Sequence, residues 1–433
     1  MDFFGENKKP NTSDIAVGFD LTDTFTQISF GRVDGEGVET LSTVAGSNSY
    51  LIPTALFKRR EVNQWFAGKE AVKYEGEDGY FVDRLLEKAL IGEEVTVGEE
   101  SFRPVSLLAL FMKRTLSLIS VMAPINRICS FMVTVDNLDN KMVEILTEAV
   151  ASLGLKTDHI YFQNHMESFY YYTIYQAEEL WKRDVLLLDF SQSHLKSYRM
   201  ECNQNTTPIV AFIDPNSYLA FKTEGLSELI INSEEARIAD QNLLSLLEDI
   251  TGEKLFSSIY FIGDNFRQEI FKDSVRFMCK KGRVFEGNNL YSKGAAFSAK
   301  NKILKTILSE SHVFLGNDKL KSNVGINVLK QGEPVYHALL DAGVNWFEAK
   351  NSCDVILDKG NKISFIITPL TGKNPEVVDI TLSDLPKRPV KTSRVHIDVS
   401  MISEMRMQVV IKDMGFGELF PASLTEWKEV VNL

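Results

Sequence analysis

Residues 15–30 read IAVGFDLTDTFTQISF, and residues 185–200 read VLLLDFSQSHLKSYRM. In both stretches, β-branched and aromatic residues surround a short polar segment, a pattern that predicts a strand, a tight turn and a second strand. The polar turn follows an aspartate in each case, Asp20 in the first stretch and Asp189 in the second. Two halves that each open with such a hairpin indicate one architecture that is used twice.

The segments after each hairpin alternate between strand and helix patterns. The run SFMVTVD at 130–136 predicts a buried strand, and the apolar spacing of 140–153 predicts a helix. In the second half, a long helix is predicted over 227–251, a strand over 258–265 and a helix over 291–308, where small residues permit close backbone approach. This rhythm predicts an α/β fold with a parallel or mixed sheet covered by helices.

The composition changes after residue 309. Residues 324–410 contain short alternating strand patterns separated by turns with Gly, Pro or Asp, which is typical of a β-sandwich. The predicted organisation is a flexible leader (1–14), a first lobe (15–184), a second lobe (185–309), a linker (310–322) and a C-terminal β-sandwich domain (323–433).

Bulk composition narrows the class of protein. Apolar residues make up 44% of the 433 residues and charged residues 24%, values typical of globular proteins. No run of 18 or more apolar residues is evident, so we expect no membrane span and a cytoplasmic location. The net charge of −12 disfavours nucleic acid as a partner, and the four scattered cysteines predict no metal site.

The order of these segments resembles the heat-shock-70 chaperones. VGFDLTDT at 17–24 is similar to the family's first phosphate loop, and LLLDFSQSHLKSY at 186–198 to its second. YFIGDNFRQ at 260–268 is similar to the adenosine motif, and LYSKGAAFSA at 290–299 to the final glycine-alanine helix. The resemblance covers nearly the whole chain. It implies two actin-like, ribonuclease-H-like lobes followed by a β-sandwich peptide-binding domain.

The resemblance also implies a nucleotide site for ATP or ADP with magnesium. Asp20, Asp189 and Lys88 stand where the family has its two loop aspartates and its catalytic lysine. The positions that would surround the nucleotide are Thr22, Asp23, Thr24, Ser191, Gln192, Ser193, His194, Gly263 and Asp264.

This site departs from the family pattern. The loops lack the glycines whose backbone N–H groups would hold phosphates, and Asp23 would add a negative charge there. Two like charges about 4 Å apart repel by roughly 4 kcal/mol at an effective dielectric constant of 20. His165 replaces a positioning glutamate, Lys196 replaces an aspartate, and the helical subdomain of the adenine pocket is almost absent. We therefore expect that the protein is not an efficient ATPase, and we assign it no cofactor.

The retained residues also fit ordinary structural roles. An aspartate after a buried strand often caps the turn that follows, which describes Asp20 and Asp189. Lys88 fits a solvated helix lysine. Neither His165 nor His194 has a second metal ligand at a suitable spacing, so hydrogen-bonded histidines are expected.

The sequence thus predicts a non-catalytic, chaperone-like scaffold that binds another protein or a peptide. The alternatives are an ATP-binding chaperone or nucleotide-dependent switch with weak ATPase activity, and a filament of actin-like lobes. LTEWKEVVNL at 424–433 is similar to the first turns of the helical lid that covers the family's peptide site. A bound peptide with so little lid would dissociate quickly.

Overall fold

The computed structural model describes residues 14–44, 46–60, 62–204, 208–316, 318–370, 374–423 and 425–433. Within these ranges the protein is a mixed α/β molecule with 26% helix and 39% strand. It divides into two compact units, Met1–Phe314 and Leu315–Leu433. The leader predicted for 1–14 lies outside the described residues except for Asp14.

The first sheet of the first unit has the strand order β11-β10-β1-β2-β3. Its strands are β1 (Ile15–Leu21), β2 (Phe25–Arg32), β3 (Glu39–Thr40), β10 (Ile128–Val135) and β11 (Ile160–Asn164), and β4 (Ile52–Pro53) also pairs with β2. β1 is antiparallel to β2 and parallel to β10, which is parallel to β11. The hairpin predicted over 15–30 is therefore confirmed.

The second sheet has the order β16-β15-β12-β13-β14-β17. Its strands are β12 (Val185–Asp189), β13 (His194–Asn203), β14 (Ile209–Lys222), β15 (Ser258–Ile262), β16 (Arg283–Gly287) and β17 (His312–Phe314). As in the first sheet, a central antiparallel hairpin, β12–β13, continues on one side through two parallel neighbours, β15 and β16. The two sheets thus repeat one pattern of strand pairing.

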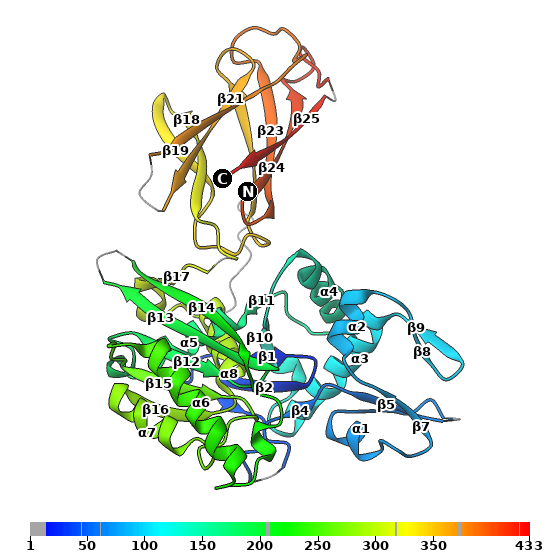
Figure 1. The fold of residues 1–433 in the computed structure, drawn as a ribbon. Helices are drawn as coiled ribbons and strands as arrows, with labels where there is room; N and C mark the ends of the chain where they lie inside the picture. The colour runs from blue at the N-terminus through cyan, green and yellow to red at the C-terminus, as the bar shows by residue number, and fades with distance from the viewer. Residues whose placement is uncertain are drawn as a thin grey trace. The chain divides into compact units, whose positions relative to one another are not determined.

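Helices cover both faces of the second sheet (Figure 1). They are α5 (His165–Ile174), α6 (Glu234–Thr251), α7 (Lys272–Lys281) and α8 (Leu290–Ile303). Alternation along β12 divides its side chains, because Val185 and Leu187 pack with α5 and α8, whereas Leu186 and Leu188 pack with α6 and α7. α8 also packs on β1 and β10 of the first sheet, through Ala295 and Ala299. It therefore joins the two halves.

Two glycines permit this close packing of α8. A Cβ added at Gly294 would lie 1.8 Å from the carbonyl oxygen of Ser168 in α5, and one added at Gly18 would lie 2.3 Å from the amide nitrogen of Ala296. No side chain fits at either position. The close approach predicted from the small residues of 291–308 is confirmed.

The remaining elements of the first unit connect or flank these sheets. They are β5 (Leu56–Arg59), β6 (Trp65–Ala67), β7 (Gly79–Val82), β8 (Val95–Val97), β9 (Glu100–Phe102), α1 (Lys69–Lys73), α2 (Leu85–Ile91), α3 (Pro104–Leu116), α4 (Asn140–Ala151) and α9 (Ile307–Ser311). α3 continues into the 3₁₀ turn η1 (Ser117–Val121). Contrary to expectation, the stretch Pro104–Val121 is long and apolar enough to cross a membrane, but 56% of it is buried inside the protein, as in a core helix.

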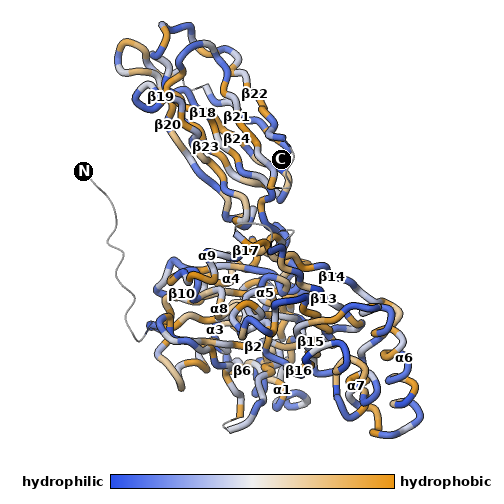
Figure 2. Tube along the Cα trace, turned by 90° about the vertical axis from the view of Figure 1, so that its left-hand side faces the viewer, coloured by the Kyte–Doolittle hydropathy of each residue, from blue (hydrophilic) through white to orange (hydrophobic). Residues whose placement is uncertain are grey.

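The second unit contains two antiparallel sheets, β19-β18-β21-β22 and β20-β23-β24-β25. Their bounds are β18 (Ser322–Lys330), β19 (Glu333–Leu340), β20 (Lys350–Leu357), β21 (Lys362–Pro369), β22 (Glu376–Thr381), β23 (Ser393–Ser403), β24 (Arg406–Gly415) and β25 (Glu426–Asn432). Hydrophilic and hydrophobic residues alternate along these strands (Figure 2). One core contains buried residues of both sheets, such as Phe365 and Val409.

Three predictions about element boundaries were wrong. The helix predicted over 227–251 begins only at Glu234, because the side chain of Ser233 caps it by accepting a bond from the Ala236 amide. Much of the predicted linker belongs to the two units, since Phe314 in β17 and Leu320 are buried in separate cores. The expected lid stub is strand β25, because pairing with β24 buries Val431.

Candidate functional site

Three aspartates mark the carboxyl ends of the central strands. Asp20 is the second-to-last residue of strand β1, Asp136 directly follows β10, and Asp189 is the last residue of β12. Because β1 and β10 are parallel, Asp20 and Asp136 lie at the same edge of their sheet. Asp20 and Asp189 are 8% and 1% exposed, so their carboxylates need partners inside the protein.

His165 is the partner of Asp20. It is the first residue of α5, a helix that Asn164 caps by accepting a bond from the Glu167 amide. The His165 Nε2 atom lies 2.8 Å from Asp20 Oδ1, and its Nδ1 lies 3.9 Å from Asp136 Oδ1. The imidazole is only 3% exposed, and it therefore occupies the space between two carboxylates.

Tyr291 links this pair to the second half of the unit. Its ring stacks on His165, with centroids 3.9 Å apart and planes 7° from parallel. Its hydroxyl donates a 2.7 Å hydrogen bond to Asp189 Oδ2, while the other carboxylate oxygen, Oδ1, accepts from the Ser191 amide at 2.9 Å and from the Ser191 hydroxyl at 2.5 Å. Both oxygens of Asp189 are thus bonded within the protein.

Lys196 completes the arrangement. Its Nζ donates to both carboxylate oxygens of Asp136, at 3.1 and 2.8 Å. We refer to Asp20, Asp136, His165, Asp189, Lys196 and Tyr291 as the central polar cluster. Its cationic groups are placed beside carboxylates that burial alone would destabilise.

Ionisation in the central polar cluster follows from its geometry. Burial alone would lower the pKa of His165, but the carboxylates of Asp20, Asp136 and Asp189 raise this pKa above its ordinary value. Burial would raise the pKa of Asp136, but His165 and Lys196 lower it below its ordinary value. The cluster therefore favours a protonated imidazole and an ionised Asp136.

The first predicted phosphate loop closes on itself. Thr22 Oγ1 donates to the carbonyl of Phe25 at 2.7 Å, and the Thr54 amide donates to the carbonyl of Thr24 at 2.9 Å. Asp23 accepts a 2.9 Å bond from the Glu87 amide at the start of α2, and burial raises its pKa. Its carboxylate caps a helix, a role that spacing alone did not reveal.

Lys88 lies apart from the central polar cluster. Its Nζ donates to the carbonyl of Asp83 at 2.6 Å and to the Asp83 carboxylate at 3.2 Å. Both bonds are made to Asp83, which precedes the helix α2 that contains Lys88. The Lys88 side chain remains 27% exposed. Within the described ranges, the ordinary interpretation as a partly solvated helix lysine fits better than a catalytic role.

The second predicted loop is also bonded internally. The Thr223 amide donates to the carbonyl of Ser193 at 3.1 Å, and the Thr223 hydroxyl donates to the carbonyl of Gln192. His194 lies 3.3 Å from the Ser193 hydroxyl through Nδ1 and belongs to β13. The connection that follows β14, residues 223–233, therefore closes this loop.

Gly263 and Asp264 follow β15 beside that loop. A Cβ at Gly263 would lie 2.4 Å from the Ser191 amide nitrogen and 2.5 Å from the Phe190 carbonyl carbon, at a φ of 102°. The close approach that this glycine allows is made by the protein's own backbone. Burial raises the pKa of Asp264, and the nearby charge of Asp189 adds to the effect.

These residues do not suit a magnesium–triphosphate group. Asp20 and Asp189, which would have to face the metal, are already bonded to His165, Tyr291 and Ser191. The amide of Ser191, a natural phosphate donor, is bonded to Asp189. Among the described side chains there is no group of three or more His, Cys, Asp or Glu residues that could hold a metal ion.

Two members of the central polar cluster were not predicted. Asp136 could have been predicted from the sequence, because it ends a buried strand pattern in the same way as Asp20 and Asp189. Tyr291 gave no signal, since an aromatic residue at the start of a helix is most often part of a core. Its role depends on the crossing of α8 between the two halves.

Comparison with known proteins assigns the chain by family. Curated proteins give no match. Residues 319–433 match a domain of unknown function, DUF8552, and residues 37–317 match the C-terminal region of a family of unknown function, DUF5716. The two matches meet near the boundary between the compact units at Phe314 and Leu315. Since the larger match covers more than half of the chain, this protein belongs to the DUF5716 family.

Proposed function

We propose that this protein is a non-catalytic relative of the heat-shock-70 chaperones that acts as a protein-binding scaffold. Two features of the fold support the relationship. The repeated strand order of the two six-stranded sheets is the arrangement expected of duplicated actin-like lobes. The two antiparallel sheets of the second unit share one core, as expected of a β-sandwich peptide-binding domain.

The proposal that the protein is non-catalytic rests on the hydrogen bonds and ion pairs within the central polar cluster. A nucleotide with magnesium would have to separate Asp20 from His165 and Asp189 from Tyr291. Breaking a buried ion pair costs about 3–5 kcal/mol. Micromolar binding supplies only about 8 kcal/mol in total, so this cost would remove much of the affinity. The cluster is better suited to fix the two halves rigidly.

The protein-binding part rests on the resemblance and on the edges of the second unit. β19 lies at one end of its sheet, and six of its eight residues are exposed, including Val335 and Tyr336. An exposed sheet edge offers main-chain donors and acceptors to an extended peptide. The second unit is therefore the first place to look for a protein partner.

Nucleotide binding gives the direct test of the non-catalytic proposal. Thermal unfolding and titration calorimetry with ATP or ADP, each with magnesium, should show no change in Tm and no saturable heat. A ligand present at a hundred times its Kd would add about 2.7 kcal/mol to the free energy of unfolding. Such a shift would be easy to detect.

The competing candidate is a nucleotide-dependent switch, which the equivalent strand-end positions of Asp20 and Asp189 favour. Saturable ATP hydrolysis that Asp189→Ala abolishes would establish this candidate and refute the scaffold. Asp184→Ala is the matched control, because Asp184 lies at the opposite end of β12. It should leave any true activity unchanged.

A further inference from the structure

Asp136 is the member of the central polar cluster that lies most open to solvent. Its side chain is 36% exposed. The side chains of Lys196, Asp20 and His165 are 16%, 11% and 4% exposed, and the remaining two members of the cluster are buried. Water therefore reaches the cluster first at Asp136.

The ion pair between Asp136 and Lys196 joins the two six-stranded sheets. Asp136 directly follows β10 of the first sheet, and Lys196 lies in β13 of the second. On the inner side of Asp136, its Oδ1 atom lies 3.9 Å from His165 Nδ1, a buried nitrogen with no hydrogen-bond partner among the described residues. The ion pair thus covers the imidazole on its solvent side.

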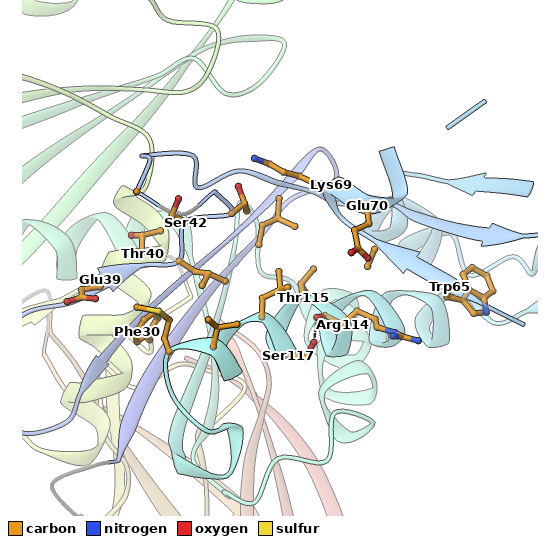
Figure 3. Close-up of a pocket in the computed structure, with 18 residues that line it drawn as sticks. Phe30, Glu39, Thr40, Ser42, Trp65, Lys69, Glu70, Arg114, Thr115 and Ser117 are labelled. Atoms are coloured by element: carbon orange, nitrogen blue, oxygen red, sulfur yellow. Dashed lines mark hydrogen bonds between the residues drawn. The ribbon is translucent and has the colours of Figure 1, made fainter. Parts of the chain in front are cut away.

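A cavity of about 720 Å³ lies elsewhere in the first unit (Figure 3). Its lining comes from β2, β3, the region of β6 and α1, and the end of α3 with η1. Apolar residues and hydroxyl groups share this lining with four charged residues, Glu39, Lys69, Glu70 and Arg114. No member of the central polar cluster lines the cavity. Access to His165 is therefore controlled at Asp136 and Lys196, apart from this cavity.

The packing of α5 on α8 would hold the two sheets together if the ion pair separated. Gly294 of α8 lies directly against the Ser168 carbonyl of α5. The rings of Tyr175 and Phe297 stack nearby, with centroids 4.8 Å apart. Salt screens an ion pair that is open to water, but it does not weaken apolar packing. The two kinds of contact can therefore be broken separately.

We propose that the Asp136–Lys196 ion pair is a latch that closes the central polar cluster, and that its release opens the cluster to solvent without separating α5 from α8. Opening would bring the imidazole of His165 into contact with water. Because the pair is partly exposed, it is weak enough for salt or a competing anion to release it. This inference goes beyond the proposed function, since a latch can operate in a scaffold and in a nucleotide-dependent switch alike.

Chemical labelling of His165 tests the latch on the full chain. Diethyl pyrocarbonate modifies accessible neutral imidazoles, and mass spectrometry locates the label. The tryptic peptide 157–182 contains both His165 and the exposed His159, which serves as an internal standard. In the wild type at low salt, His165 should react far more slowly than His159.

Variants at Lys196 then identify the contact. Lys196→Met should raise the labelling rate of His165 by at least about fivefold, the value of one good ion pair. This variant keeps the carboxylates that favour the protonated, unreactive imidazole, so a faster reaction can come only from opening. Lys196→Arg retains the positive charge and should label as slowly as the wild type. Lys222→Met is the matched control, because Lys222 is exposed on the neighbouring strand β14 and lies outside the cluster.

Salt tests the latch without any substitution. Raising the NaCl concentration from about 0.1 M to about 1 M shortens the Debye length from about 10 Å to about 3 Å. In the wild type, this change should speed the labelling of His165 relative to that of His159. In Lys196→Met, where the pair is already absent, the ratio of the two rates should stay constant.

The proposal is overturned by any of four results. One is that salt leaves the wild-type ratio unchanged. Another is that Lys196→Met labels His165 no faster than Lys222→Met does. The third is that Lys196→Arg labels it as fast as Lys196→Met. The fourth is that Lys196→Met speeds the labelling of His312, in β17 of the same unit, as much as that of His165, which would mean that the whole unit unfolds.

Discussion

His165 is held in place by two carboxylates and by the ring of Tyr291. Its replacement by Ala would leave Asp20 buried with no cationic partner. We expect His165→Ala to lower the free energy of unfolding by about 3 kcal/mol, the usual cost of an orphaned buried charge. Urea denaturation followed by circular dichroism gives the measurement. His194→Ala should cost far less, because His194 is only half-buried and lies outside the central polar cluster.

The difference in the free energy of unfolding between the wild type and His165→Ala should change with pH in a definite direction. Folding raises the pKa of His165, so its contribution is fully present below the ordinary histidine pKa of about 6.5 and is lost as the pH rises through the higher folded value. The stability gap between the wild type and His165→Ala should therefore narrow from pH 6 to pH 9. A gap that widens over this range would mean that the neutral imidazole is the stabilising form. His396, whose pKa is also raised, titrates in both proteins and cancels.

Four of the six residues of the central polar cluster were singled out from the sequence. They are Asp20, Asp189, His165 and Lys196, and they do meet in the first unit. Lys88 and Asp23 were also singled out, but they are bonded at α2. Spacing along one strand predicts which side chains share a sheet edge. It does not predict which helix terminus will supply a free amide, since that depends on the packing of segments distant in the chain.

At the scale of single elements, β25 shows where local pattern was misleading. Residues 424–433 contain good helix formers, yet Glu426–Asn432 pair with the edge of β24. A strand places successive side chains on opposite faces, so Val431 is 6% exposed and Val430 is 48% exposed. Pairing with β24 therefore outweighed the local helix preference of this segment.

This alternation gives a matched pair of variants. Val431→Asp would place a carboxylate in the core of the second unit and should destabilise it by several kcal/mol. Val430→Asp changes the same residue type one position away, on the exposed face, and should cost less than about 1 kcal/mol. Urea titration of both variants decides the matter. Equal costs would contradict the strand and would favour the helix that the sequence suggests.

Most helices and strands were predictable in kind, because their apolar periods are clear. β1 and β12 are followed by their partner strands as expected, and α4 lies within its predicted range. α8 (Leu290–Ile303) begins one residue before its predicted range of 291–308 and ends before residue 308. The ends were less predictable. The start of α6 was decided by the cap at Ser233, and α7 lies where no helix was expected. Caps and short amphipathic helices depend on single residues or on contacts from other segments, so a periodic pattern does not reveal them.

At the scale of the whole molecule, the boundary at Phe314 and Leu315 predicts independent folding. Each unit has cores of its own, and the second unit has a single shared core. Fragments 1–314 and 315–433 should each unfold cooperatively, and the sum of their calorimetric transitions should reproduce the full chain. A fragment 315–433 that lacks a cooperative transition would show that the second unit needs the first in order to fold.

The short strand β17 is the last part of the first unit before that boundary, and it pairs in parallel with the beginning of β14. Any tension applied to the second unit must therefore pass through three residue pairs before it reaches the helices and the buried interior. If those pairs separate first, the chain gains about 10 Å of slack at roughly 3.3 Å per residue while the rest of the first unit stays intact. β17 would then detach before any other part of the first unit when the second unit is pulled.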